Sequence, residues 1–282
     1  MNESKTDVCS TRYPVMLVHG TSAADRRSPR TWRRIPSALA DNGAMVCFGK
    51  QDAWGSVQSN KLQLAKSVDE ALKLYNTEKI NIIAHSKGGL DARALASLPG
   101  YESNIASITT ISTPHRGIGW LSKLWPFGLI FFAAGTVLLY PFLRLLCGDK
   151  RPNPYRLLKD MTHKGCERFN LETPDRPEIF YQSYAGKMSK NSQNNLLLLS
   201  RLAANKFDGE NDGMISVESA KWGLFKGVIS GSGKRGLSHT DEIDFFKRNY
   251  EGADMLTDGI HTYSDVPQIY IRIVRDLKEL GF

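Results

Sequence analysis

A short apolar run, Ile80 to Ala84, leads directly into the segment AHSKG at positions 84–88, and a helical pattern follows it. The succession predicts a strand, a sharp turn that carries Ser86, and a helix. Only small residues fit on either side of a serine in such a turn, because a larger side chain would collide with the turning backbone. Ala84 and Gly88 meet this requirement. The segment therefore predicts a parallel βα unit and marks one candidate site.

The alternation of strand and helix patterns extends along most of the chain. It predicts parallel βαβ units in one sheet, and so an α/β fold with a mostly parallel sheet flanked by helices. We expect an N-terminal tail at 1–12 and one domain at 13–282. The predicted strands are 14–18, 44–48, 80–84, 105–111 and 178–184, and the predicted helices are 33–42, 60–75, 87–98 and 266–280.

Residues 120–165 interrupt the alternation and predict a helical insertion after the fourth strand. Within it, residues 124–143 contain no Asp, Glu, Lys, Arg or His, and these 20 residues are enough to span a bilayer. The helix-breaking residues inside the stretch favour broken helices over one continuous span; they are Pro126, Gly128, Gly135 and Pro141. We expect an apolar lid or interfacial helices here, with a membrane hairpin or anchor and ordinary core as alternatives.

A serine in such a turn is suited to nucleophilic attack on an acyl group. The N-terminus of the following helix brings backbone N–H groups close to the hydroxyl. Acyl transfer also needs two donors for the oxyanion, one after the nucleophile and one after an early strand. The sequence nominates the backbone N–H groups of Lys87 and Thr21. We interpret His19, in the same early loop, as a structural anchor; an ordinary βα turn that happens to contain serine is the alternative for the whole motif.

The serine needs a base, and proteins with this turn place an acid and then a histidine after it in the chain. His239 lies in a polar loop after a glycine-rich stretch and is favoured over His261, which lies close before the last helix. The other histidines come too early in the chain or lie beside the insertion: His19, His85, His115 and His163.

The acid is predicted to be Asp212. It lies in an Asn-Asp-Gly turn, a sequence that can present a carboxylate at a strand end, and we favour it over nearby Asp208. Its expected role is to hold the His239 imidazole in the correct tautomer. One membrane crossing at 124–143 would separate Ser86 from Asp212 and His239, so the triad excludes a single transmembrane span.

Several segments together resemble the bacterial triacylglycerol lipase family of the α/β-hydrolase superfamily. They appear in the family's order over about residues 13–280: 13–20, 32–36 with 42–44, the AHSKGG segment, 111–117, 211–214 and 238–241. The resemblance implies Ser86 as nucleophile, Asp212 as acid and His239 as base. The chain departs from many relatives in having Ala84 where they have glycine. Some relatives carry a disulfide near the acid, and this chain has no cysteine there.

Some relatives bind a structural calcium through an acidic residue two positions after the histidine, and Asp241 holds that position. The resemblance therefore implies a calcium site at Asp241, with no further ligand matched. No cofactor is needed for the chemistry itself. Relatives with a zinc subdomain carry extra histidines and aspartates before the serine, and the segment from Gly20 to His85 has no such cluster.

Charge and composition restrict the partners. The chain has a net charge of +8, which agrees weakly with an anionic interface, but no lysine or arginine run resembles a nucleic-acid-binding arm. The N-terminus lacks the features of a secretory signal, which favours the cytoplasm by default unless a leader was removed. Four cysteines match no metal or redox motif, and a pair between Cys147 and Cys166 stays open.

The sequence thus predicts a serine carboxylic-ester hydrolase, a lipase that acts on acylglycerols at a lipid–water interface. A short-chain carboxylesterase or polyester hydrolase with the same triad is the first alternative. A membrane-associated binding protein without turnover is a remote one, because fold does not guarantee function.

Overall fold

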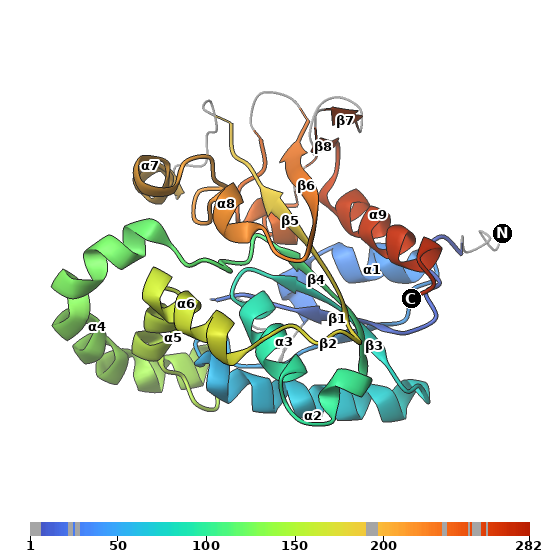
Figure 1. Cartoon of the computed structure of the whole chain (residues 1–282), viewed down its shortest axis with the longest axis horizontal. Coiled ribbons are helices and arrows are strands. Elements are labelled where there is room, and N and C mark those ends of the chain that lie inside the picture. The colour runs from blue at the N-terminus through green and yellow to red at the C-terminus, as the bar shows by residue number, and fades with distance from the viewer. Residues whose placement is uncertain are drawn as a thin grey trace.

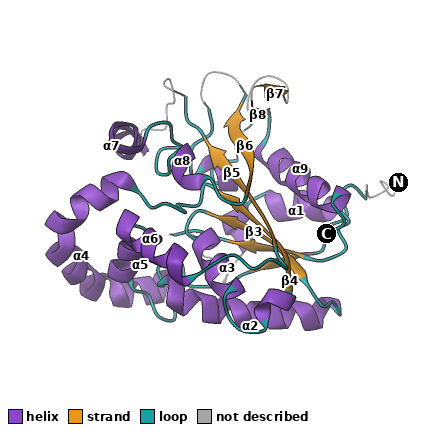
Figure 2. Ribbon diagram, viewed as in Figure 1, coloured by secondary structure: helices purple, strands orange, loops and turns teal. Residues whose placement is uncertain are grey.

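The computed structural model of the 282-residue chain describes residues 7–21, 25, 29–189, 197–232, 236–247, 249, 255–257 and 259–282. For residues 29–30, 127, 129–134, 136–139, 146, 198, 255 and 257 it describes the backbone alone. Eight strands form one twisted sheet with helices on both of its faces (Figures 1 and 2). All neighbouring pairs are parallel except β7 with β8.

The sheet has the order β2-β1-β3-β4-β5-β6-β8-β7. Its strands are β1 (Val15–Val18), β2 (Val46–Phe48), β3 (Ile80–His85), β4 (Ile105–Ile111), β5 (Phe180–Gly186), β6 (Leu224–Gly231), β7 (Met255–Thr257) and β8 (Ile260–Tyr263). The predicted strand at 105–111 is confirmed over its full length. The α/β fold with a mostly parallel sheet is confirmed as well.

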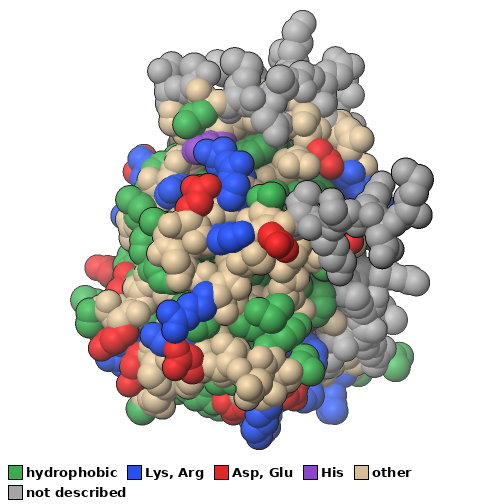
Figure 3. Space-filling model, turned by 90° about the vertical axis from the view of Figure 1, so that its right-hand side faces the viewer, with side chains coloured by type: hydrophobic (Ala, Val, Ile, Leu, Met, Phe, Trp, Pro, Cys, Tyr) green, Lys and Arg blue, Asp and Glu red, His purple; other side chains and the backbone are tan. Residues whose placement is uncertain are grey.

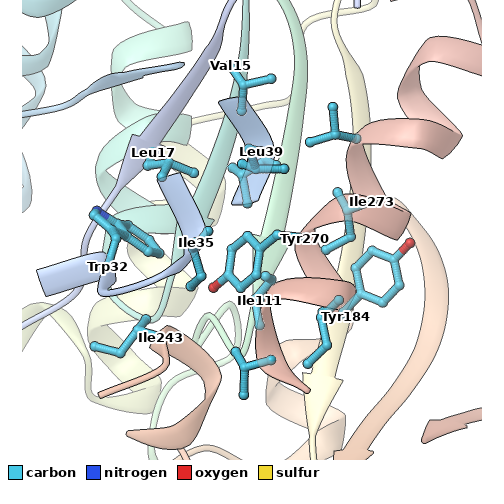
Figure 4. Packing of buried hydrophobic residues seen from close by; sticks show 14 of the residues in the cluster. Val15, Leu17, Trp32, Ile35, Leu39, Ile111, Tyr184, Ile243, Tyr270 and Ile273 are labelled. Atoms are coloured by element: carbon cyan, nitrogen blue, oxygen red, sulfur yellow. The ribbon is translucent and has the colours of Figure 1, made fainter. Parts of the chain in front are cut away.

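Alternate side chains of the central strands bury two cores. On one face, Val15 and Leu17 of β1 pack with α1 (Ile35–Asp41) and α9 (Val266–Glu279), a cluster that includes Trp32 and Tyr270 (Figure 4). On the other face, Met16 packs with α2 (Val57–Tyr75) and α3 (Gly88–Ala96). This division follows from the period of two along a strand, which sends successive side chains to opposite faces.

The insertion after β4 is helical, as predicted. It consists of α4 (Gly119–Leu146), α5 (Pro154–Asp160) and α6 (His163–Glu172). The expectation of broken helices at 124–143 is wrong, because α4 is one helix of 28 residues that contains Pro126 and Pro141. Figure 1 shows that α4 curves, and prolines inside a helix bend it by removing a hydrogen bond and crowding the preceding turn. Among the described residues, no helix has the length and hydropathy needed to cross a membrane.

Other helices lie between and after the strands of the second half. They are α7 (Leu198–Asp208), α8 (Val217–Ala220) and short 3₁₀ turns, of which the turn Asp241–Ile243 follows the predicted base. Residues 7–12, part of the predicted tail, pack on the domain, since Cys9 is fully buried and its N–H donates to Asn42 O at 2.8 Å. All four cysteines are free thiols, so Cys147 and Cys166 are not paired.

Candidate active site

Ser86 lies between the end of β3 and the start of α3, with a φ of 55°. This left-handed conformation is strained for a residue with a Cβ atom. Two contacts to the end of β4 and the loop after it hold this conformation: the Ser86 N–H donates to Ile111 O at 2.9 Å, and the Thr113 hydroxyl donates to Ser86 O at 2.7 Å. The turn therefore points the serine side chain out of the sheet at the carboxyl ends of the strands.

Close approach of the backbone explains the small residues around the serine. A Cβ atom at Gly88 would lie 2.5 Å from His19 O, and one at Gly20 would lie 2.7 Å from the Ser86 Cβ. The loop after β1 is thus packed directly against the nucleophile turn. Thr21 follows in that loop, and Lys87 precedes the first turn of α3. Both predicted oxyanion donors belong to segments that border Ser86, and their role stays a prediction.

His239, from the loop after β6, lies between the serine and a carboxylate. Its Nε2 is 2.9 Å from Ser86 Oγ, and its Nδ1 is 2.7 Å from Asp212 Oδ2. The backbone supports the same arrangement, since the His239 N–H donates to Asp212 O at 2.9 Å. Ser86 is 7% exposed and His239 is 6% exposed. The three residues singled out by the sequence are therefore in hydrogen-bond contact, although 153 positions separate the serine from the histidine.

The Asp212 carboxylate is built into a tight turn. Its Oδ1 accepts hydrogen bonds from the N–H groups of Met214 at 2.9 Å and Ile215 at 2.8 Å, and Oδ2 faces His239. Burial opposes ionisation, but the imidazole and the two N–H donors outweigh it and hold the pKa of Asp212 below its usual value. A carboxylate that stays ionised in this position can orient the imidazole and stabilise its protonated form.

A second buried carboxyl group, Glu242, was not predicted from the sequence. Its Oε2 lies 2.9 Å from His85 Nε2, its Oε1 accepts from the Ser112 hydroxyl at 2.9 Å, and it is 3.9 Å from His239 Nδ1. Burial and then the charge of Asp212 raise its pKa well above the usual value. The only signal in the sequence was its position three residues after the histidine, which a short 3₁₀ turn converts into proximity.

The residues that were weighed against the triad have other contacts. Asp208 ends α7, and its Oδ2 accepts from the N–H of Gly119 at the start of α4. His261 donates from Nε2 to Lys226 O at 2.9 Å, while His115 is buried and stacks on Trp222 at 5.2 Å between ring centroids. His163 is exposed at the start of α6.

His19 has the structural contacts expected of a loop anchor. Its ring nitrogens face Gly20 O at 2.8 Å and Gln51 O at 3.1 Å, and its own carbonyl accepts from the Gln51 side chain at 2.8 Å. These bonds connect the loop after β1 to the segment after β2. They hold the loop that carries Thr21 in place.

The Lys87 side chain turns away from the chemistry. Its Nζ lies 2.7 Å from both carboxylate oxygens of Asp91, and both residues are almost completely buried. Asn60 donates to the same carboxylate at 2.8 Å. Burial raises the pKa of Asp91. This pair fixes the first turn of α3, and it leaves only the backbone of Lys87 for an oxyanion.

The surroundings of Asp241 do not fit a calcium site. Its Oδ2 accepts from the N–H of Ser238 at 3.2 Å and from the Ser238 hydroxyl at 2.5 Å, so it closes its own turn. Calcium takes six to eight oxygen ligands, usually with several carboxylates. Within the described residues, the one cluster of three potential metal ligands joins His85, His239 and Glu242 and leaves Asp241 out.

Comparison with known protein families shows to which family the chain belongs. The family model described as "alpha/beta hydrolase fold" matches residues 13–194, about two thirds of the chain and the part that contains the nucleophile turn. The chain belongs to the α/β-hydrolase family. Within this α/β hydrolase, the matched region ends before Asp212 and His239, so the acid and the base rest on the geometry given above.

Sequence relatives of the α/β hydrolase include lipases. The chain is 29% identical over 307 aligned positions to a triacylglycerol lipase of Pseudomonas fragi, covering 98% of this chain and 99% of the relative. It is 28% identical to triacylglycerol lipase 2 of Saccharomyces cerevisiae, covering 89% of this chain and 74% of the relative. These relatives place the hydrolase among the lipases and esterases, which are carboxylic-ester hydrolases.

Solved structures agree on the fold. A metagenomic carboxyl esterase superposes with a TM-score of 0.70 at 16% identity, over 95% of this chain and 76% of the esterase. The mature lipase of Bacillus licheniformis gives 0.61 at 18% identity, over 87% and 90%. At these identities the comparison supports the α/β-hydrolase fold alone.

Proposed function

We propose that this α/β hydrolase is a triacylglycerol lipase that uses Ser86, His239 and Asp212 through an acyl-enzyme. One observation carries the proposal: the His239 imidazole lies within hydrogen-bond distance of both Ser86 Oγ and Asp212 Oδ2, at 2.9 and 2.7 Å. Nucleophile, base and orienting acid in this arrangement are what serine acyl transfer requires. A binding protein without turnover has no need of a buried triad.

The contacts define the proton path. His239 Nε2 takes the proton of the Ser86 hydroxyl as Oγ attacks the ester carbonyl carbon, and Asp212 stabilises the imidazolium. The oxyanion is received by the N–H groups of Thr21 and Lys87. His239 then gives the proton to the departing alcohol, which leaves an ester on Ser86. Water, deprotonated by His239, attacks that ester; the fatty acid is released as the bond to Oγ breaks, and His239 returns the proton to Ser86 Oγ.

Two further observations favour an acylglycerol over a small soluble ester. Both relatives given above are triacylglycerol lipases, and the one from Pseudomonas fragi matches over 99% of its length. Ser86 and His239 are nearly buried, and a segment that opens to admit a lipid would suit this burial. We propose that α4 provides this lid, since its residues 124–143 have no charged side chain. Phe142 and Leu124 are exposed, and Trp125 is half-buried, while the side chains of Phe127, Ile130, Phe131 and Phe132 lie outside the described residues.

The test is the initial rate of tributyrin hydrolysis as its concentration passes the solubility limit, with Ser86→Ala as the control. A rate that rises sharply once droplets form supports a lipase. Saturation below the limit identifies a carboxylesterase, and a rate that the Ser86→Ala variant retains would overturn the triad. Labelling of Ser86 by a serine-directed phosphonate tests the nucleophile separately from the substrate class.

A further inference from the structure

The helical insertion holds half of the chain's net charge. Residues 119–172, from the start of α4 to the end of α6, contain eight Lys or Arg and four Asp or Glu, so these 54 residues contribute +4 of the net +8. The cations lie outside the uncharged stretch 124–143, and Lys123 and Arg144 border it directly. The insertion therefore has an uncharged apolar stretch with a cation at each end. A buried core does not need such flanking cations, and a solvated face does not need such an apolar stretch.

The exposed side chains of the insertion are more strongly positive than its overall composition indicates. Six of its cations are exposed: Lys123, Arg144, Lys150, Arg151, Lys164 and Arg168. Two of its four acids are buried. Asp149 accepts from the N–H groups of Ala53 and Trp54, and Asp160 pairs with Arg156 at 2.9 Å. Glu167 and Glu172 are the exposed acids, and Glu172 lies 3.9 Å from Arg168.

Large apolar side chains are exposed on the same part of the molecule. On α4, Leu124, Phe142 and Leu145 are 53%, 55% and 71% exposed, and on α7, Leu199 and Leu202 are 81% and 51% exposed. Helix α7 lies beside the beginning of α4, where Asp208 Oδ2 accepts from the N–H of Gly119 (Figure 1). Isolated exposed leucines are common, but several on two adjoining helices mark an interaction surface.

The side that carries α9 and the chain termini is different. Figure 3 shows basic, acidic and apolar side chains interspersed there. On α9 two of the three cations are paired with acids, Arg272 with Asp276 at 3.1 Å and Arg275 with Glu279 at 3.7 Å. The insertion, with twice as many cations as acids, therefore differs from α9 in its balance of charge.

We propose that the insertion together with α7 is a docking surface for a membrane that contains anionic phospholipids. Apolar side chains that enter the interface and cations that meet acidic headgroups are the two signals that hold a protein on such a membrane. A neutral fat droplet would give the cations no partner, and a nucleic acid would give the leucines none. The surface goes beyond the proposed function, because it binds a lipid that is not the substrate and does so without turnover.

The experiment uses the full chain with Ser86→Ala, so that no lipid is hydrolysed and failure of the proposed activity cannot affect the result. Flotation measures its partition onto vesicles of phosphatidylcholine alone and of phosphatidylcholine with phosphatidylglycerol. We expect binding to the anionic vesicles, weakened by salt, and at least about tenfold less to the neutral ones. Equal partition onto both, or binding to neither, overturns the proposal.

Two double variants that reverse the charge of two cations test where the docking surface lies. In the Ser86→Ala background, Lys123→Glu with Arg144→Glu changes the net charge by the same amount as Arg272→Glu with Arg275→Glu on α9. We expect only the first pair to lower partition, by at least about tenfold. Lys123→Gln with Arg144→Gln is the milder form, and thermal unfolding checks that each variant is folded. An equal loss in the α9 pair overturns the assignment to the insertion.

An apolar pair tests α7 in the same assay. Leu199→Ser with Leu202→Ser should lower partition onto anionic vesicles by about tenfold, because two exposed leucines no longer enter the interface. The matched control is Leu74→Ser with Leu280→Ser, two leucines that are 73% and 55% exposed on other helices or their ends. The same loss in the control pair, or no loss in the α7 pair, removes α7 from the surface.

Discussion

His85 Nε2 lies 2.9 Å from Glu242 Oε2, so the residue before the nucleophile is bonded to a carboxyl group three residues after the base. Both side chains are buried. Burial lowers the pKa of His85 well below its usual value, and burial together with Asp212 raises that of Glu242. Both shifts favour the neutral form of the group concerned. The protonated form of Glu242 avoids a second negative charge beside the triad acid while still bracing the turn on which Ser86 lies.

Because burial favours the protonated form of Glu242, the glutamine amide is a good substitute for it. Glu242→Gln should keep the bond from Ser112 and lower the free energy of unfolding by less than about 1.5 kcal/mol. Glu242→Ala leaves two buried polar partners and a cavity, and should cost about 3–5 kcal/mol. Denaturant unfolding of the two variants measures the difference. Equal destabilisation by both substitutions would contradict a neutral carboxyl group.

The same group predicts a dependence of stability on pH. Because the pKa of Glu242 is raised above 4.5, the folded chain keeps this proton at pH values where the unfolded chain has released it. The contribution of Glu242 is fully present below pH 4.5 and is lost as the pH rises through the folded-state pKa. Glu242→Gln cannot ionise, so its stability should fall less over this range. Parallel curves for the wild type and Glu242→Gln would contradict the raised pKa.

Substitution of Asp212, with Asp208 as the matched control, tests which residue is the acid of the triad. Asp212→Ala should lower kcat for p-nitrophenyl butyrate by about three to four orders of magnitude, since His239 loses its orienting carboxylate. Asp208→Ala should leave kcat nearly unchanged and cost about 1 kcal/mol of stability, since it caps the start of α4. Steady-state kinetics and thermal unfolding separate the two effects. A large loss of kcat in Asp208→Ala would move the acid assignment.

The Lys87 side chain should matter for folding and little for turnover. Lys87→Met leaves Asp91 buried without its cation, which should lower the free energy of unfolding by about 3–5 kcal/mol. The backbone N–H proposed for the oxyanion is unchanged, so kcat at a temperature where the variant is folded should fall less than about tenfold. Adding Asp91→Leu should restore much of the stability. A hundredfold loss of kcat with little destabilisation would assign the ammonium group to the chemistry.

Chelation tests the calcium prediction at Asp241. Since Ser238 donates two hydrogen bonds to Oδ2 of Asp241 and no second carboxylate joins Asp241 in a cluster among the described residues, we expect EDTA to leave the Tm of the wild type unchanged. Differential scanning calorimetry before and after dialysis against EDTA measures it. A Tm that falls with EDTA and recovers on addition of calcium would show that ligands besides Asp241 complete a site.

The first half of the fold was predictable because its strands are apolar and a clear helical pattern, as in α2, lies between them. The signal at Ser86 came from local sterics, which one sequence records directly in Ala84 and Gly88. The strands β6 to β8 were missed because Lys226, Gly227 and Ser230 interrupt the apolar pattern of a strand near the sheet edge. Packing against neighbouring elements, and not local preference, makes this segment extended.

The triad residues were predictable from chain order, but Glu242 was not. An acidic residue in a polar loop ordinarily faces water, and nothing local marks this one as buried. Its burial depends on Ser112 and His85, which are 130 and 157 positions away. The continuity of α4 was missed for a related reason, since Pro126 and Pro141 weaken an isolated helix.

The left-handed φ of 55° at Ser86 has a cost in every folded molecule. A residue with a Cβ atom is destabilised in that conformation by about 1–2 kcal/mol, and glycine is not. Evolution for thermal robustness alone would therefore replace Ser86 by glycine. Laboratory evolution of this chain that screens only for stability should drift toward an inactive, more stable hydrolase, so any such screen needs a turnover assay in the same round.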